Sequence, residues 1–185
     1  MAETFSTMLP LGTIAPNFTL TDVVSSQLFS LHQKKASNAT VIFFTCNHCP
    51  YVKHIQDKLI DIAKAYQTKG VDFIAINSND VEKYPLDAPD KMREQATLHH
   101  FPFPYLYDET QEVAKAYHAA CTPDFYIFDV NLSCIYRGRF DSATPGNAQP
   151  ITGKELTGAL DHALSGQSID SKQYPSVGCS IKWKK

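Results

Sequence analysis

The residues of this chain best suited to chemistry are Cys46 and Cys49, which form a C-x-x-C motif. The five apolar or β-branched residues at 41–45 predict a short buried strand directly before the motif. The cysteines therefore lie where a strand passes into a helix, because apolar residues recur at helical spacing after them: Val52, Ile55, Leu59, Ile62, Ala63 and Tyr66. Residues three apart on a helical turn share one face, so both thiols can meet disulfide geometry, which needs Cα atoms about 4.4–6.8 Å apart.

The start of the predicted helix would make the pair reactive. Free backbone N–H groups and the helix dipole favour an anion at a helix N-terminus, and the thiolate is the nucleophilic form of cysteine. We therefore expect a stabilised thiolate at Cys46. Pro50 fits the first turn, where its missing N–H costs little. A C-x-x-C pair that follows a strand and opens a helix indicates redox chemistry.

A C-x-x-C pair is also half of many zinc sites, and this alternative stays open. A structural zinc site needs a second pair of ligands, and the sequence has no second C-x-x-C or close Cys/His pair of that kind. A copper or zinc carrier that uses Cys46, Cys49 and a histidine is a less favoured alternative, with His48, His54 and His99–His100 as available ligands. We expect no resident metal and no cofactor.

Length and composition predict one globular domain over residues 1–185. The chain is 43% hydrophobic and 19% charged, with a net charge of −2, which is ordinary for a globular protein. No run of one charge points to nucleic acid or a membrane surface, so we expect neither as a partner. Residues 1–16 lack the basic and apolar regions of a signal peptide, so we expect a cytoplasmic protein. Cytoplasmic thiols are mostly kept reduced, so a disulfide there is more often catalytic or transient than structural.

A second buried strand is predicted at 71–77, after the helix. A strand–helix–strand sequence of this length implies a right-handed parallel crossover. Loops at the carboxyl ends of parallel strands hold the sites of open α/β sheets, so the loop with Cys46 and the segment 77–80 should share one sheet edge. The segment 77–80, Asn-Ser-Asn-Asp, either lines the site or forms a turn, and turn chemistry is the favoured interpretation.

The remaining segments predict further elements. Residues 18–22 and 27–31 alternate as the strands of a hairpin do. The segments 108–111 and 152–155 resemble capping boxes, so we expect one helix from about residue 109 to 118 and another that starts at the second box. Residues 167–185 show no clear periodicity and are expected to form a tail.

Several segments carry a family resemblance that extends over nearly the whole chain. Residues 46–53, 77–80, 121–125 and 178–183 are similar to the thioredoxin-like, peroxiredoxin-related proteins of the AhpC/TSA (redoxin) type. The resemblance implies a thioredoxin-like α/β fold, in which helices flank a central mixed β-sheet and an extra β-hairpin precedes the core.

The resemblance also divides the single domain into parts. Residues 1–38 would form the N-terminal hairpin extension, residues 39–166 the core and residues 167–185 a C-terminal tail. The C-x-x-C motif would lie inside the core.

Thioredoxin-like proteins place a cis-proline against the C-x-x-C motif, and Pro123 stands at the matching position. The resemblance implies that this proline turns the backbone of Thr122 outward, where an extended substrate peptide adds as a short strand. The isomerase and oxidase branches of the superfamily are similar to this chain in having a histidine before the second cysteine. An imidazolium of His48 beside the thiolate would lower the thiolate pKa, so we expect a reduction potential above the roughly −270 mV of thioredoxin. Asn47 and Pro50 complete the residues expected to tune the pair.

Thiol–disulfide exchange is the expected activity. Cys46 attacks a protein or small-molecule disulfide, Cys49 resolves the mixed disulfide, and an unidentified thiol donor returns the electrons. The alternative is a peroxiredoxin-like thiol peroxidase with an antioxidant function. Peroxiredoxins need a Pro-x-x-x-Thr/Ser-x-x-Cys pattern with Cys49 as its cysteine, but Cys46 stands at the Thr/Ser position and no proline precedes it at the right place. Cys121 and Cys179 are candidate extra redox cysteines, and Cys179 in a mobile tail would act as a second resolving thiol.

Overall fold

The computed structural model describes residues 3–34 and 37–185, so residues 1–2 and 35–36 of the predicted N-terminal extension lie outside the described residues. The strands are β1 (Glu3–Phe5), β2 (Thr19–Asp22), β3 (Leu28–Ser30), β4 (Ala39–Phe44), β5 (Val71–Asn77), β6 (Tyr105–Tyr107), β7 (Cys121–Thr122), β8 (Asp124–Phe128), β9 (Cys134–Gly138) and β10 (Val177–Ser180). The helices are α1 (Pro50–Gln67), α2 (Pro89–Leu98), α3 (Glu112–Ala116) and α4 (Lys154–Ser165), with short 3₁₀ helices η1 (Leu31–Gln33) and η2 (Pro85–Asp87). Within these described ranges, no helix has both the length and the apolar character needed to cross a membrane.

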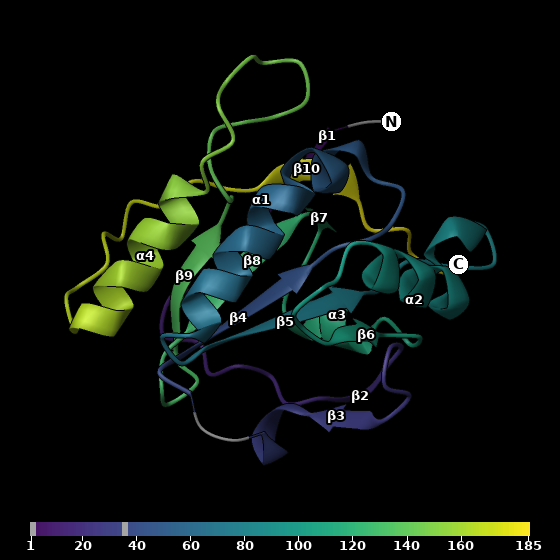
Figure 1. Ribbon diagram of the computed structural model, residues 1–185, viewed down its shortest axis with the longest axis horizontal. Coiled ribbons are helices and arrows are strands. Elements are labelled where there is room, and N and C mark those ends of the chain that lie inside the picture. The colour runs from purple at the N-terminus through teal and green to yellow at the C-terminus, as the bar shows by residue number, and fades with distance from the viewer. Residues whose placement is uncertain (1–2, 35–36) are drawn as a thin grey trace.

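The main sheet has seven strands in the order β3-β2-β6-β5-β4-β8-β9 (Figure 1). β4, β5 and β6 run parallel, and the other neighbouring pairs are antiparallel. The strands predicted before the C-x-x-C motif and at 71–77 are confirmed as β4 and β5. β2 and β3 form the predicted hairpin, at the edge of the sheet beside β6. The expected α/β architecture, with a mixed central sheet and an extra N-terminal hairpin, is therefore confirmed.

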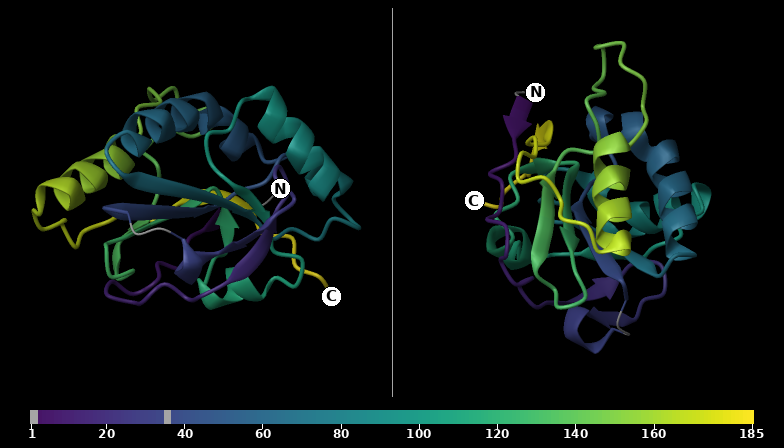
Figure 2. Two further views of the ribbon diagram at one scale, coloured as in Figure 1. Left: turned by 60° about the horizontal axis from the view of Figure 1, so that its bottom comes forward. Right: turned by 90° about the vertical axis from the view of Figure 1, so that its left-hand side faces the viewer.

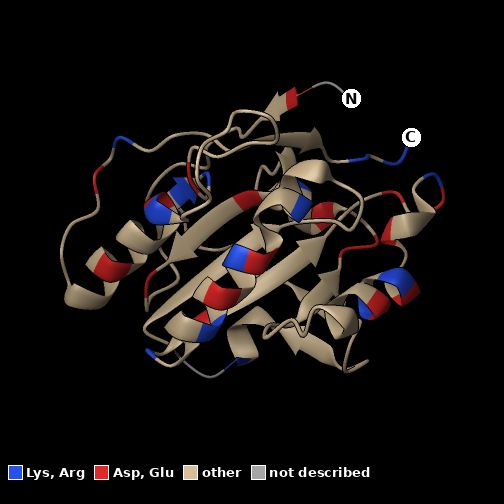
Figure 3. Cartoon of the chain, turned by 45° about the horizontal axis from the view of Figure 1, so that its top comes forward, with Lys and Arg blue, Asp and Glu red and all other residues tan. Residues whose placement is uncertain are grey.

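Helices cover both faces of this sheet, which explains why the sequence of β4 is continuously apolar. Val41 and Phe43 pack in a core shared with α1, α2 and α4. Ile42 and Phe44 belong to a second core, which includes α3. Figure 2 shows the three longer helices along one side of the sheet and α3 on the other. A strand buried on both faces has no polar side, whereas the helices carry acidic and basic side chains in mixed order (Figure 3).

Both predicted capping boxes are wrong in their hydrogen bonds. α3 begins at Glu112 rather than near residue 109, and Asp108 accepts a hydrogen bond from the Ala114 N–H at 2.9 Å. α4 begins close to its expected start but has no side-chain cap. Asp141, from the preceding loop, instead accepts the N–H of Gly153 at 2.6 Å. The polar residues indicated where helices begin, but tertiary contacts decided which atoms satisfy the free N–H groups.

The expected C-terminal tail contains a strand, β10, that the sequence did not indicate. β10 pairs antiparallel with β1 on one side and with β7 on the other. Its register places Cys179 opposite Thr122. The four residues of β10 have no apolar alternation and both partner strands are distant in sequence, so local patterns could not predict it. Figure 1 shows this small sheet beside the start of α1.

Candidate active site

Three thiols meet at the start of α1. Cys46, Cys49 and Cys179 pack together, and interactions of Cys49 with Cys46 and with Cys179 shift the pKa of all three thiols. With Val52 and the partly buried Tyr51, they form a small cluster separate from the two main cores. The structure therefore brings together the two predicted redox cysteines and one of the two candidate extra cysteines.

The other candidate extra cysteine, Cys121, lies outside this cluster. Cys121 is buried, and its Sγ lies 4.0 Å from the backbone oxygens of Pro123 and Ser176. Burial raises the pKa of its thiol. A redox role for Cys121 stays a prediction without a sulfur contact in this structure to support it.

The helix begins later than expected, and this changes which cysteine it affects. α1 starts at Pro50, and Cys49 is its N-cap residue. The free N–H groups of the first turn therefore lie at Cys49, while Cys46 lies in the preceding loop. The prediction that the helix N-terminus stabilises a thiolate at Cys46 is wrong for this reason. Pro50 occupies the first helical position, as expected.

Cys49 is the more acidic thiol of the reduced pair. A hydrogen bond from the Cys46 thiol lowers the pKa of Cys49 to about 5 against the effect of burial, and the Cys179 thiol and the Val52 N–H add to the lowering. The same hydrogen bond raises the pKa of Cys46 well above its usual value, and burial and the charge of Asp87 raise it further. Ionisation of the reduced pair therefore favours Cys49, whose protonated form donates to the Thr122 backbone oxygen at 3.2 Å.

Thr122 contacts both sulfur atoms of the C-x-x-C pair. Its backbone oxygen lies 3.2 Å from Cys49 Sγ, and its hydroxyl oxygen lies 3.5 Å from Cys46 Sγ. The peptide bond between Thr122 and Pro123 is cis, as the family resemblance implies. At Thr122, however, β7 is already paired with β10. A substrate strand that joins this residue would have to replace β10 or approach from another side, and the substrate-binding role of Thr122 and Pro123 stays a prediction.

Asp87, which the sequence analysis did not single out, is a buried carboxylate that holds the loop between the cysteines. Its Oδ1 accepts the Asn47 N–H at 2.8 Å, and its Oδ2 accepts a hydrogen bond from Asn79 Nδ2 at 2.8 Å. The same Oδ2 lies 2.6 Å from Nδ1 of His48. Asp87 has 0% exposed surface. In the sequence it is one acidic residue before a helix, so its burial could not be foreseen.

The segment 77–80 both lines the site and forms a turn. All four of its residues are buried. Asn77 Nδ2 donates to the backbone oxygen of Asp87 at 2.9 Å, while Asn77 Oδ1 accepts the Asn79 N–H at 3.0 Å. The favoured turn interpretation therefore describes the local backbone, and the site-lining alternative describes the function of the side chains.

Cys46, His48 and Asp87 could together hold a metal ion. One ligand atom of each lies within 4.8 Å of the others, and thiolate and imidazole suit zinc and copper. Both oxygens of Asp87 already accept hydrogen bonds, from Asn47 and from Asn79. A metal bound through this carboxylate would compete with the bonds that hold the loop.

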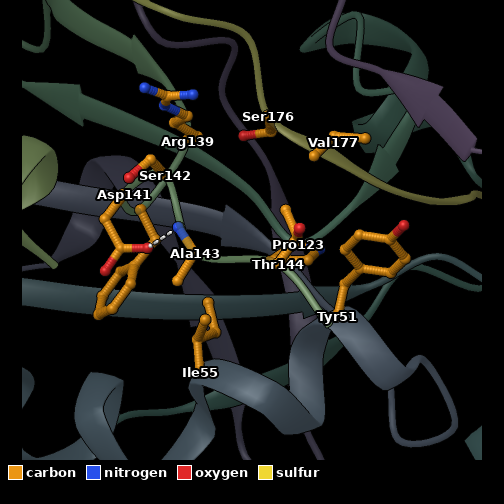
Figure 4. Close-up of a pocket in the computed structure, with 11 residues that line it drawn as sticks. Tyr51, Ile55, Pro123, Arg139, Asp141, Ser142, Ala143, Thr144, Ser176 and Val177 are labelled. Carbon is orange, nitrogen blue, oxygen red and sulfur yellow. Dashed lines mark hydrogen bonds between the residues drawn. The ribbon is translucent and has the colours of Figure 1, made fainter. Parts of the chain in front are cut away.

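A pocket opens beside Pro123 (Figure 4), and Tyr51 of the thiol cluster is one of its lining residues. It lies between α1, the segment after β9 and the residues that lead into β10. Its lining residues are Tyr51, Ile55, Pro123, 139–144, Ser176 and Val177. Cys46 is 2% exposed and Cys49 is 0% exposed, so both cysteines lie beneath the surface, and none of the described residues that line this pocket is a cysteine.

The model of the AhpC/TSA family matches residues 11–136, which include the C-x-x-C motif and Thr122–Pro123. This chain belongs to the AhpC/TSA family. No curated protein matches the sequence of this AhpC/TSA protein.

Solved structures place this AhpC/TSA protein among thioredoxin-like folds. An uncharacterized conserved protein from Geobacillus kaustophilus is 55% identical over 100% of this chain and 97% of that chain, with a TM-score of 0.97. A hypothetical protein from Sinorhizobium meliloti 1021 is 41% identical over 98% of both chains, with a TM-score of 0.95. A thiol:disulfide interchange protein of the thioredoxin family from Chlorobium tepidum TLS is 15% identical over 83% of this chain and 97% of that chain, with a TM-score of 0.63. The last similarity shows a shared fold, so the thioredoxin-like architecture is confirmed.

Proposed function

We propose that this AhpC/TSA protein is a thiol–disulfide oxidoreductase that cycles between a Cys46/Cys49 dithiol and the corresponding disulfide. The observation that carries the proposal is the hydrogen-bonded pair of thiols at the start of α1, with a thiolate at Cys49. The fold shared with a thiol:disulfide interchange protein supports the same class of reaction. The proposed partners are a protein or small-molecule disulfide and a thiol that returns the electrons.

Cys46 is the proposed attacking residue, because Cys49 is fully buried while Cys46 keeps 2% of its surface exposed. The Cys49 thiolate takes the proton of Cys46 as Cys46 Sγ bonds to one substrate sulfur, and the other substrate sulfur leaves as a thiolate. Cys49 then loses this proton, attacks Cys46 Sγ and releases the second substrate thiolate. Two electrons pass to the substrate, and the Cys46–Cys49 disulfide remains.

The thiolate at Cys49 also sets the proposed redox poise. Stabilising the reduced form makes the disulfide more oxidising, so the reduction potential should lie above the roughly −270 mV of thioredoxin. In this proposal Asn47, His48 and Pro50 act on the pair by fixing the loop and the helix start rather than by direct charge. Equilibration with glutathione buffers measures the potential, and a value at or below that of thioredoxin would reject this part of the proposal.

Reduction of insulin disulfides, with dithiothreitol as the electron donor, tests the function. Cys46→Ser and Cys49→Ser should each abolish turnover, and Cys49→Ser should accumulate a mixed disulfide at Cys46 that mass spectrometry detects. Cys134→Ala is the matched control, because Cys134 is a buried cysteine of β9 outside the thiol cluster. Full activity of Cys46→Ser would overturn the assignment of the attacking sulfur.

A thiol peroxidase is the second candidate function, and the thiolate at Cys49 favours it. Cys49 stands at the cysteine of the peroxiredoxin pattern, where peroxide would oxidise the thiolate to a sulfenic acid that a neighbouring thiol condenses with. Peroxide consumption that survives in Cys46→Ser and is lost in Cys49→Ser would favour this candidate. Loss of insulin reduction in both variants, with slow peroxide consumption in the wild type, would favour disulfide exchange.

A copper or zinc carrier is the third candidate, because Cys46, His48 and Asp87 converge. Metal content after incubation with zinc or copper salts, compared between the wild type and His48→Ala, tests it. Stoichiometric metal that is retained by the wild type and lost in the variant would favour a carrier. Neither nucleic acid nor a membrane takes part in any of these proposed activities.

A further inference from the structure

We infer that Cys179 is a second disulfide partner of Cys49, so that the oxidised protein exchanges a Cys46–Cys49 disulfide for a Cys49–Cys179 disulfide. This inference rests on the proposed disulfide exchange and adds a third sulfur to it. Cys49 is the central sulfur of the cluster, since Cys46 and Cys179 pack with it and both lower the pKa of its thiol. The main effects on the pKa of Cys46 come from Cys49, burial, Asp87 and Thr122.

Strand pairing holds Cys179 at this position. β10 places Cys179 opposite Thr122, and the Thr122 backbone oxygen lies 3.2 Å from Cys49 Sγ. The neighbouring Gly178 lies so close to β7 that a Cβ built on it would meet the Thr122 oxygen at 2.0 Å. β1 pairs with the other edge of β10, where Glu3 lies opposite Cys179. Cys179 is therefore fixed in register beside Cys49, and the expectation of a mobile tail cysteine is corrected.

β10 lies where the family resemblance places an extended substrate peptide. It runs antiparallel to β7, is paired at the residue before Pro123, and carries a cysteine next to the C-x-x-C pair. The chain thus presents its own cysteine-bearing strand to its redox site. Cys179 is 2% exposed, so this sulfur is reached from inside the cluster rather than from solvent.

The exchange between the two disulfides needs no external oxidant or reductant. The Cys179 thiolate attacks Cys49 Sγ of the Cys46–Cys49 disulfide, a new Cys49–Cys179 bond forms and the bond to Cys46 breaks. Cys46 leaves as a thiolate and takes up the proton that Cys179 released, so no electrons enter or leave. The oxidised protein would then keep a free thiol at Cys46, and the disulfide would join the start of α1 to β10.

The electrostatics change in the direction that this exchange needs. In the reduced protein, burial, the hydrogen bond to Cys49 and the Cys49 charge together raise the pKa of Cys179 to about 12, although Lys182 lowers it. Once Cys49 is part of a disulfide, it carries no charge and no longer accepts the proton of the Cys179 thiol as a thiolate does. The Cys179 thiolate is therefore easier to form in the oxidised protein than in the reduced one.

Oxidation of Cys46→Ser with diamide, a small thiol oxidant, tests the inference without any turnover assay. The variant keeps four of the five cysteines, and its titratable thiols should fall from four to two. Trypsin should then yield peptide 36–53 linked to peptide 173–182, and reduction should separate them. Cys46→Ser/Cys121→Ser should still form this link, whereas Cys46→Ser/Cys179→Ser and Cys49→Ser should not.

The outcomes separate this inference from the proposed function. If the wild type forms Cys46–Cys49 and reduces insulin, but Cys46→Ser loses no thiols or links peptide 36–53 to peptide 116–137, the third sulfur is not a partner and the inference is overturned. If the wild type forms neither disulfide and reduces no insulin, the function itself fails. Circular dichroism melts of the reduced variants confirm folding, and Cys179→Ala replaces Cys179→Ser where the serine variant melts early.

Discussion

Nδ1 of His48 lies 2.6 Å from Oδ2 of Asp87, a carboxylate with 0% of its surface exposed. The ring of His48 also stacks on Tyr84, with centroids 5.4 Å apart. The side chain of His48, which precedes the second cysteine, therefore points toward Asp87 and Tyr84. The charge that raises the pKa of Cys46 is that of Asp87. The resemblance drew attention to the imidazole, but the carboxylate behind it has the clearer electrostatic effect on the site.

Removing the charge of Asp87 should make Cys46 easier to ionise. In Asp87→Asn the pKa of Cys46 should fall, because a negative charge that raises it is gone. Alkylation of the Cys46 thiol by iodoacetamide at neutral pH should be faster, while unfolding free energy should drop by about 1–3 kcal/mol because the hydrogen bonds to Asn79 and His48 are disturbed. Asp80→Asn is the control, since Asp80 is also a buried carboxylate but bonds Lys83 and the Glu82 N–H rather than the loop of the motif. Unchanged or slower alkylation in Asp87→Asn would contradict the role of the charge.

The reduced protein should show a thiolate that titrates with a midpoint of about 5, at Cys49. Its ultraviolet absorbance should vanish in Cys49→Ser and shift to higher pH in Cys46→Ala, which removes the hydrogen-bond donor. The folded pKa of about 5 lies below the ordinary 9.0, so the folded chain releases this proton first. The unfolding free energy of the reduced wild type, relative to Cys49→Ser, should therefore rise as the pH increases from about 5 to 9 and be lost as the pH falls through 5. A pH-independent difference would refute the assignment.

Asp124 should make the protein less stable as the pH rises. Burial raises its pKa from 3.8 to about 7, although Tyr126 and Ser6 donate hydrogen bonds to its Oδ2. The contribution of the protonated Asp124 carboxyl to the unfolding free energy is fully present below pH 3.8 and is lost as the pH rises through 7. The unfolding free energy of Asp124→Asn, relative to that of the wild type, should therefore increase between pH 3.8 and 7. We expect an increase on the order of 2–4 kcal/mol in denaturant unfolding. Asp57→Asn, on the exposed face of α1, should show no such trend, and a parallel trend in both variants would argue against a buried acid.

Gly178 should not tolerate a side chain. A Cβ would meet the Thr122 oxygen at 2.0 Å, so Gly178→Ala must push β10 away from β7. We expect a loss of about 1–3 kcal/mol in unfolding free energy and less Cys49–Cys179 cross-link in a Cys46→Ser background. Gly158→Ala in α4 is the matched control, because no described atom outside its chain neighbours and its own helix backbone lies within 4 Å of the Cβ position. This variant should stabilise the chain by about 0.5–1 kcal/mol. Equal stability of the two variants would show that β10 is loosely held.

Local patterns predicted those parts of the fold whose partners are close in sequence. The helical spacing from Val52 to Tyr66 predicted α1, and the apolar run at 71–77 predicted β5 with its correct bounds. Local patterns did not predict β10, because its pairing with β1 and β7 is long-range. The burial of Asp87 was not predicted, because a carboxylate is expected at the surface unless its hydrogen-bond donors are known. These donors come from two other loops. The thiolate was also predicted on the wrong cysteine. The helix starts at Pro50, and a shift of one turn changes which sulfur lies beside its free N–H groups.

The two ends of the described chain are both fastened to the redox site. β1 borders the strand that carries Cys179, and the N–H of Lys182 bonds Asn79 Oδ1 at 2.8 Å, beside the carboxylate that holds the loop of the motif. A tag or a truncation at either terminus would therefore disturb a contact of the redox site. At one end the contact is the pairing of β1 with β10, and at the other it is the hydrogen bond from Lys182 to Asn79. Recombinant material for redox measurements should therefore be prepared with tags removed from both ends, and a potential that changes on tag cleavage would report on this mechanical link.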